Sequence, residues 1–312
     1  MKLLICDPVD QESIDAMRAG GISVHVRDGI GSEELQQVID DYDALVVRSR
    51  TQVTADMMDR ARRLRLIIRA GVGLDNVDVR HARARGIEVQ NTPSASSRSV
   101  AELTVGYMLA MARQIPQMTA SMKSSEWQKG AFSRGIEIAG KTLGLIGCGR
   151  IGTIVARAAV GLGMEVLFYC LEPFPSIPGA RPASLEELIA RADFISLHVP
   201  YCDETSCMLG EEEFNRMKDG VYIINCGRGG TLDEEALYHA IVNGKVAGAA
   251  LDVFEREGDG GGRKLMALPQ VIGSPHVGGG TREARRRVGQ EIVQIATEFA
   301  QRETQPAAVM GG

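Results

Sequence analysis

Short apolar runs alternate with stretches of helical spacing along most of the chain. In the first third, the runs predict buried strands at 2–6, 44–47 and 66–69. Apolar residues at helical intervals fill the stretches 10–19, 32–40 and 54–63. The alternation resumes with strands predicted at 141–146, 164–169, 194–199, 221–225, 247–252 and 271–272, and a helix at 151–162. Strands separated by helices of this length form parallel sheets covered on both faces, so the pattern predicts two doubly wound α/β units.

Two further helical segments have features of their own. Residues 100–111 are apolar almost all round, and a helix without a polar face is buried on every side. We expect it between the two domains or in a dimer interface. The last helix begins at the N-cap Thr281, with apolar residues at helical spacing from Ala284 to Phe299. Its arginines at 285–287 are interpreted as a solvated face, with an anion site as the alternative.

The composition is that of an ordinary globular protein. The 312 residues are 44% hydrophobic and 24% charged, and they suggest about two domains. A net charge of −5 gives no reason to expect nucleic acid or an anionic membrane as a partner. No apolar run approaches the length of a membrane span, and the opening residues are predicted to be a strand rather than a signal peptide. Six scattered cysteines predict reduced thiols without a metal, and a cytoplasmic location.

The stretch 140–152, GKTLGLIGCGRIG, predicts a dinucleotide site. It places a strand before three glycines and a helix behind them. Gly147 allows a tight turn, Gly149 lets the backbone approach a pyrophosphate, and Gly152 lets the helix pack on the sheet. The helix N-terminus then offers N–H donors and a positive dipole end to the phosphates. A purely structural strand–helix turn is the alternative.

Four further segments contain motifs that, together with the glycine turn, are specific to one protein family. They are RAGVGLDNVD at 69–78, NTPSASSRSVAELT at 91–104, INCGRGGTLDEEAL at 224–237, and AALDVFERE with SPHVGG at 249–279. With the glycine turn, the chain resembles the D-isomer-specific 2-hydroxyacid dehydrogenases, especially their D-3-phosphoglycerate dehydrogenase branch. The resemblance implies a Rossmann-type NAD-binding domain (98–284) inserted into a flavodoxin-like substrate domain (1–97, with the C-terminal helix returning at 285–312). It also implies a homodimer formed through the nucleotide-binding domain.

Hydride transfer from a 2-hydroxy acid needs three protein functions. Arginine suits the carboxylate, because its planar fork makes two parallel hydrogen bonds. Histidine suits the hydroxyl proton, since its unperturbed pKa lies near neutrality, and a neighbouring carboxylate fixes its tautomer. By resemblance these catalytic residues are Arg228, His276 and Glu257. Gly258 replaces the family's usual proline here, so the loop is expected to be more flexible and Glu255 competes for the role of Glu257.

The cofactor is expected to be NAD, although one position departs from the family. A carboxylate for the adenine ribose is expected about 20 residues past the glycines, and Cys170 stands there. Glu172 is the candidate replacement. No arginine follows directly to receive a 2′-phosphate, which favours NAD and leaves NADP possible. His198 is interpreted as structural, with a lesser role near the cofactor as the alternative. The resemblance further implies cofactor contacts from Arg150, Ile151, Val199, Cys226, Gly278 and Asp252, the last orienting the nicotinamide carboxamide.

The substrate is predicted from a polar turn in the first domain. Arg48 and Ser49 follow a strand, and they suit a phosphate at the end of the substrate away from its carboxylate. Backbone N–H groups of Val72 and Gly73 are implied to bind the carboxylate. The predicted reaction is oxidation of D-3-phosphoglycerate to 3-phosphohydroxypyruvate, a step of serine biosynthesis. A solvated polar turn at 48–49 is the alternative.

Other functions remain open at this point. The alternative enzymes are a glyoxylate or hydroxypyruvate reductase, or another D-2-hydroxyacid dehydrogenase. A protein of another class, an NAD(H)-sensing binding protein like the corepressors among the relatives, is the third possibility. Because few residues follow the last helix, no C-terminal regulatory domain and no serine feedback are expected.

Overall fold

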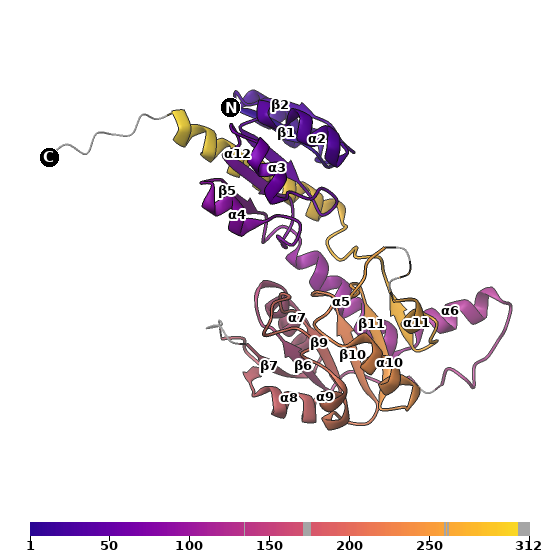
Figure 1. Cartoon of the computed structure of the whole chain (residues 1–312). Helices are drawn as coiled ribbons and strands as arrows, with labels where there is room; N and C mark the ends of the chain where they lie inside the picture. Colours follow the sequence, from indigo (N-terminus) through magenta and orange to yellow (C-terminus); the bar gives the residue numbers. More distant parts are fainter. Residues whose placement is uncertain (134, 171–175, 259, 261, 305–312) are drawn as a thin grey trace. The chain divides into compact units, whose positions relative to one another are not determined.

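The computed structural model describes residues 1–133, 135–170, 176–258, 260 and 262–304 (Figure 1). The chain divides into two compact units. The first consists of residues 1–96 together with the chain after residue 278, and the second is the continuous segment 97–278. Each is built on one parallel sheet, so the predicted α/β fold with one domain inserted into the other is confirmed. Within the described residues, no helix combines the length and apolar character that a membrane crossing needs.

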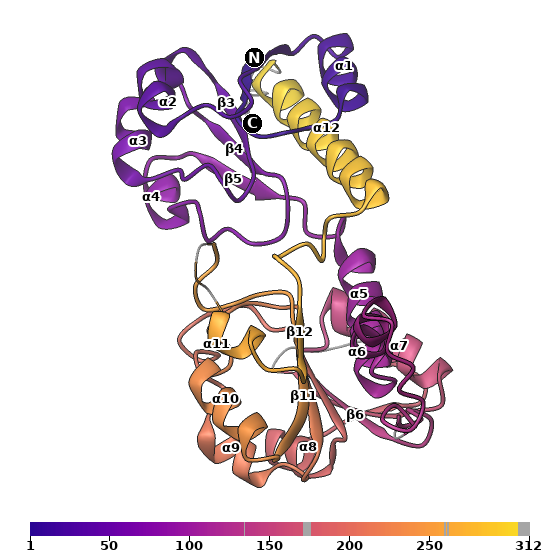
Figure 2. The ribbon, with the colours of Figure 1, turned by 90° about the vertical axis from the view of Figure 1, so that its right-hand side faces the viewer.

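The first unit has a five-stranded parallel sheet in the order β2-β1-β3-β4-β5. Its strands are β1 (Lys2–Ile5), β2 (Ser23–Val26), β3 (Ala44–Val47), β4 (Leu66–Arg69) and β5 (Glu88–Asn91). One face is covered by α1 (Gln11–Ala19) and α12 (Arg282–Thr304), and the other by α2 (Ser32–Val38), η1 (Ile39–Asp41), α3 (Ala55–Arg60) and α4 (Val79–Ala84) (Figure 2). The central strand β3 is buried throughout, which explains its uninterrupted apolar run.

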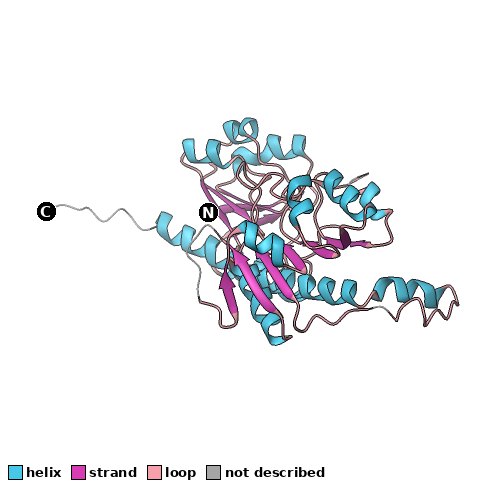
Figure 3. Cartoon of the chain, turned by 90° about the horizontal axis from the view of Figure 1, so that it is seen from below, coloured by secondary structure: helices cyan, strands magenta, loops and turns pink. Residues whose placement is uncertain are grey.

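The second unit has seven parallel strands in the order β12-β11-β10-β9-β6-β7-β8. They are β6 (Thr142–Ile146), β7 (Glu165–Tyr169), β8 (Ala180–Pro182), β9 (Phe194–Leu197), β10 (Val221–Asn225), β11 (Val246–Leu251) and β12 (Val271–Gly273). Helices α5 (Ser97–Ala112) and α7 (Arg150–Gly161) pack on one face, and α8 (Leu185–Arg191), α9 (Glu211–Arg216), α10 (Glu234–Val242) and α11 (Arg263–Met266) on the other. Figure 3 shows helices and strands by colour.

One row of paired residues crosses the second sheet near the carboxyl ends of its strands. It runs through Tyr169, Ile146, Leu197, Asn225, Leu251 and Gly273. The chain passes outward from β6 to β7 and β8 and then returns to β9 on the other side of β6, so β6 marks the point where the strand order reverses. In open α/β sheets ligands bind outside the carboxyl ends at this point.

For α5 an interface between the domains or in a dimer stays a prediction, and for α12 the structure corrects one residue. Helix α5 belongs to the second unit and buries Met108 and Met111 in its core, while Glu102 and Gly106 are exposed. The arginines of α12 form a solvated face only in part. Arg285 and Arg286 are exposed, but the prediction is wrong for Arg287, whose Nε donates a 2.8 Å hydrogen bond to the carbonyl of Ala95.

Candidate active site

The glycine turn after β6 is packed too tightly for side chains at two of its three glycines. Gly147 has φ +95°, and a Cβ there would lie 2.7 Å from the carbonyl oxygen of His198. A Cβ on Gly152 would lie 2.3 Å from the carbonyl oxygen of Gly147, so α7 contacts the turn directly. A Cβ on Gly149 would meet nothing within 4 Å, so the backbone is open on that side. The residues present therefore fit a dinucleotide pyrophosphate at the N-terminus of α7.

Arg150 and Ile151 form the first turn of α7, where Arg150 is exposed and Ile151 half-buried. On the neighbouring strand ends, Val199 is half-buried and Cys226 is buried. Burial raises the pKa of the Cys226 thiol to about 12, so this side chain stays neutral. Cys170 is half-buried directly after β7. Glu172 lies outside the described residues.

His198 packs against the glycine turn. Its backbone N–H donates to Ile146 (2.7 Å), and its Nε2 lies 3.0 Å from the hydroxyl of Ser196. Nδ1 is buried and has no hydrogen-bond partner within the described parts of the chain. Burial lowers the pKa of His198 to about 4, so the ring is neutral at physiological pH. The structure therefore favours a structural role for His198 against the glycine turn.

Arg228 lies in a turn shaped by a buried asparagine. Asn225, the last residue of β10, donates from its amide nitrogen to the Arg228 carbonyl (2.9 Å) and accepts the Gly227 N–H (3.0 Å). Thr231 donates to the same carbonyl (2.7 Å). The guanidinium itself donates to the Gly227 carbonyl (2.8 Å) and is partly exposed. Sequence reasoning missed Asn225 and Thr231, whose signal is a polar pair flanking the Cys-Gly-Arg-Gly-Gly turn.

Asp252 shapes the loop that carries the candidate histidine. It is 1% exposed, and its carboxylate accepts the N–H groups of Val277 and Gly278, both at 2.8 Å, and the hydroxyl of Ser274. Tyr107 of α5 donates in turn to Ser274. Burial raises the pKa of Tyr107 to about 12, so the phenol remains a donor. Neither Tyr107 nor Ser274 was identified from the sequence.

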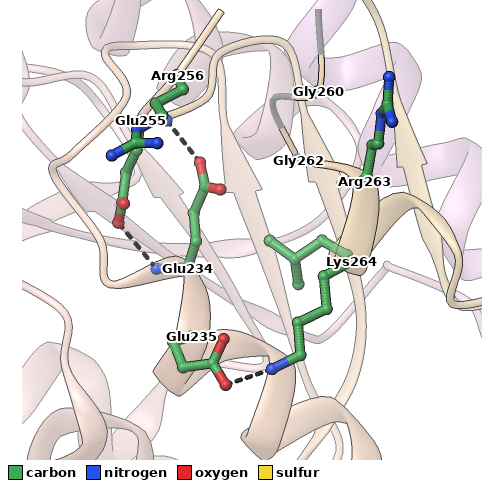
Figure 4. Close-up of a pocket in the computed structure, with 9 residues that line it drawn as sticks. Glu234, Glu235, Glu255, Arg256, Gly260, Gly262, Arg263 and Lys264 are labelled. Atoms are coloured by element: carbon green, nitrogen blue, oxygen red, sulfur yellow. Dashed lines mark hydrogen bonds and ion pairs between the residues drawn. The ribbon is translucent and has the colours of Figure 1, made fainter.

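His276 pairs with Glu257 in this loop. Its Nδ1 lies 2.8 Å from both carboxylate oxygens of Glu257. A carboxylate only accepts, so Nδ1 carries a proton, and in the neutral ring Nε2 then has the lone pair. His276 has φ +52°, an uncommon conformation for a residue other than glycine, and its N–H donates to the Asp252 carbonyl (2.9 Å). Glu255 bonds instead to Glu234 of α10 (Figure 4).

The register of the sheet brings these groups to one edge. Arg228 and His276 each follow the paired row by three residues, on β10 and β12, and Asp252 follows it by one on the strand between them. Gly147 follows the same row on β6. A Cβ on Gly229 would lie 1.9 Å from the Phe254 carbonyl, so the Arg228 turn abuts the loop that leads to Glu257. The edge thus combines the guanidinium of Arg228, the His276–Glu257 pair and the glycine turn.

The predicted substrate residues lie at the corresponding edge of the first sheet. Asp7 is buried and accepts both the Arg48 N–H (2.7 Å) and the Arg50 side chain (2.9 Å). The Asn76 amide donates to the Arg48 carbonyl (2.6 Å). Arg50 therefore holds the turn together, whereas the Arg48 side chain is half-buried and makes no hydrogen bond or ion pair with the described residues. Ser49 is exposed in the same turn.

Val72 and Gly73 stand in the turn after β4. The Thr92 N–H donates to the Gly71 carbonyl (3.0 Å), and the Asn91 side chain donates to the Val72 carbonyl. Val72 and Gly73 are half-buried.

Across the residues that the structure describes, no group of three or more histidine, cysteine or acidic side chains is arranged to hold a metal ion.

Comparisons with known proteins give the following matches. The family model described as "D-isomer specific 2-hydroxyacid dehydrogenase, NAD binding domain" matches residues 105–278. A hydroxypyruvate reductase of Thermotoga maritima is 46% identical over 291 residues, which are 92% of this chain and 94% of that protein. A D-3-phosphoglycerate dehydrogenase of Archaeoglobus fulgidus is 43% identical over 305 residues; these are 96% of this chain but only 57% of the relative, so the chain spans little more than half of its length. The crystal structure of a D-lactate dehydrogenase from Aquifex aeolicus, complexed with NAD and lactic acid, aligns with a TM-score of 0.86 at 29% identity, covering 96% of this chain and 97% of that one.

Proposed function

Because the chain belongs to the D-isomer specific 2-hydroxyacid dehydrogenase family, we propose that it interconverts D-3-phosphoglycerate and 3-phosphohydroxypyruvate with NAD. The family itself makes the chain an NAD-dependent oxidoreductase of D-2-hydroxy acids. The choice of substrate rests on the Arg48 turn. We propose NAD rather than NADP as the cofactor because no arginine directly follows Cys170 to receive a 2′-phosphate.

Three side chains of the second unit perform the chemistry in this proposal. The bound nicotinamide supplies the hydride acceptor or donor. Arg228 holds the substrate carboxylate with its planar fork. His276 accepts the hydroxyl proton at Nε2 during oxidation and returns it during reduction. Glu257 keeps the proton of the neutral ring on Nδ1 and stabilises the imidazolium that forms.

The observation that carries the substrate assignment is that the Arg48 side chain has no hydrogen-bond or ion-pair partner among the described residues. The residue is half-buried and its side chain lacks an anionic partner in the described residues, while Asp7 and Asn76 fix the backbone on which it stands. A partly buried cation without a partner is costly, and a phosphate provides two charge-assisted hydrogen bonds to it. Ser49 adds a hydroxyl donor in the same turn.

The first prediction therefore concerns Arg48→Ala and a matched pair of substrates. Hydroxypyruvate and 3-phosphohydroxypyruvate differ only by the phosphate. In the variant, kcat/KM should fall by about 10- to 100-fold for the phosphorylated acid, because hydrogen bonds to charged groups contribute about 1.5–3 kcal/mol. For hydroxypyruvate we expect little change. Steady-state kinetics with NADH, repeated with NADPH, measure both the substrate and the cofactor preference.

Two results would count against this assignment. An equal loss with both acids would mean that Arg48 does not bind phosphate. A wild-type enzyme that prefers hydroxypyruvate or glyoxylate would favour the second candidate, a hydroxypyruvate reductase. That candidate is supported by the Thermotoga maritima relative, which this chain matches over 94% of its length.

We also propose a homodimer formed through the second unit. Helix α6 (Ile115–Lys123) has no buried residue in the single chain and extends away from the sheet (Figure 1). Ile115, Met122 and Trp127 are exposed along this segment, Trp127 by 80%. Large apolar side chains gathered on one segment are typical of an interface, and a second copy of the chain is the partner proposed.

Light scattering should therefore report twice the 33.6 kDa chain mass. Trp127→Glu should shift the protein towards the mass of a single chain, because burying an unpaired carboxylate at an interface is unfavourable. Val242→Glu is the matched control, since Val242 is another exposed apolar residue of the second unit but lies on α10. A single-chain mass for the wild type would contradict the proposal.

A further inference from the structure

The loop between β11 and α11 is joined to α10 by two reciprocal hydrogen bonds. The Glu255 N–H donates to Oε1 of Glu234 (2.6 Å), and the Glu234 N–H donates to Oε1 of Glu255 (3.2 Å) (Figure 4). Each carboxylate thus accepts the backbone N–H of the other residue. We call this arrangement the Glu234–Glu255 clamp. It fixes the loop two residues before Glu257, the partner of His276.

On the N-terminal side of Glu257 the clamp is the nearest attachment of the loop, and Phe254 is packed one residue before it. Phe254 is packed between Gly229 and Gly262, where added Cβ atoms would lie 1.9 Å from its carbonyl oxygen and 2.3 Å from its ring. After Glu257 the chain continues with Gly258 at φ +98°, in a segment rich in glycine. Glycine has more backbone freedom than any other residue. Between the clamp and Glu257 stands only Arg256, which makes no hydrogen bond or ion pair with the described residues.

The clamp brings two like charges together, which the surroundings must offset. Burial raises the pKa of the Glu234 carboxyl, and the charge of Glu255 adds to the effect. The backbone N–H bonds and the positive end of α10 act in the opposite direction. Lys264 does not neutralise the pair, because it contacts Glu235 on the next position of the helix (Figure 4).

We propose that Glu234 and Glu255 are positioning residues for the dehydrogenase reaction, because their clamp holds Glu257 within hydrogen-bonding distance of His276. The inference rests on the proposed catalytic function of His276 and Glu257. Without the clamp, Glu257 spends less time against Nδ1, so fewer molecules have the imidazole in the productive tautomer and orientation. The turnover number then falls, while binding of the cofactor and of the substrate carboxylate does not depend on the clamp.

Two adjacent glutamates of α10 give a matched test. Glu234→Ala should lower kcat by about tenfold, with KM for NADH and for the 2-oxo acid little changed, because the displaced group acts on the chemical step. Glu235→Ala should leave kcat unchanged, since Glu235 stands in the same helical turn but contacts Lys264 and His239 rather than the loop. Glu234→Gln should restore most of the activity, because the amide oxygen can accept the same N–H.

A double variant separates positioning from general destabilisation. In the Glu257→Gln background, Glu234→Ala should cause no further loss, because no carboxylate remains to be positioned. Multiplied losses, or equal losses in Glu234→Ala and Glu235→Ala, would overturn the clamp. If Glu257→Gln alone leaves kcat unchanged, the proposed catalytic pair fails instead. If Glu234→Ala does not fold, Glu255→Ala tests the same proposal, because it removes only the longer hydrogen bond, from the Glu234 N–H to Glu255 (3.2 Å).

Discussion

Replacing His276 with asparagine should lower kcat by about 10²- to 10⁴-fold, the usual contribution of a positioned general acid–base. Asparagine is suited to the test because it tolerates positive φ, and residue 276 has φ +52°. The loop should therefore keep its hydrogen bonds to Asp252. An amide cannot accept the hydroxyl proton at neutral pH, so the chemical step is lost. Steady-state kinetics in both directions, with NADH binding measured separately by fluorescence, check this result.

The chain contains a close control for this variant. His239 and Glu235 form a second exposed histidine–carboxylate pair in the second unit, with Nε2 and Oε1 3.0 Å apart. They lie on α10 rather than beyond the strand ends. His239→Asn should leave kcat unchanged. If both histidine variants retain wild-type turnover, His276 is not the proton carrier, and intact NADH binding would show that the cofactor site survives.

The central strands of both sheets could be predicted from the sequence because they are buried on both faces. Ala44–Val47 and Thr142–Ile146 are entirely apolar or small and entirely buried. The edge strands β2, β5 and β8 could not be predicted this way, whereas the edge strand β12 was predicted at 271–272. In β2 (Ser23–Val26) only Val24 is buried, and β5 (Glu88–Asn91) is half-buried throughout, so polar residues interrupt the pattern. The short edge strand β8 (Ala180–Pro182) contains an arginine and a proline.

The candidate site also has features that could be predicted from the sequence and features that could not. The glycine turn could be predicted because its geometry depends on local spacing. The hydrogen bonds that support the site link residues far apart in the chain, such as Tyr107 and Ser274, and no local pattern reveals them. Nor could the sequence decide between Glu255 and Glu257. The choice depends on Glu234, which approaches Glu255 only after α10 has packed beside the loop.

The stability of the protein should also depend on pH through His198. The folded-state pKa is about 4, against 6.5 for an ordinary histidine. Above pH 6.5 neither state binds a proton at this ring. As the pH falls below 6.5, the unfolded state binds a proton that the folded state excludes, so the free energy of unfolding decreases. By pH 4 the loss reaches about 3 kcal/mol, since each pKa unit corresponds to about 1.4 kcal/mol.

Urea unfolding of the wild type and of His198→Gln at steps between pH 7 and pH 4 measures this contribution. Glutamine does not titrate, and its amide can still reach the Ser196 hydroxyl that now contacts Nε2. The difference in unfolding free energy between the two proteins should therefore shift in favour of the variant as the pH falls, whatever its value at pH 7. His239→Gln, which changes an exposed ring, should follow the wild type. If the His198→Gln curve runs parallel to that of the wild type, the ring of His198 is not held neutral by burial.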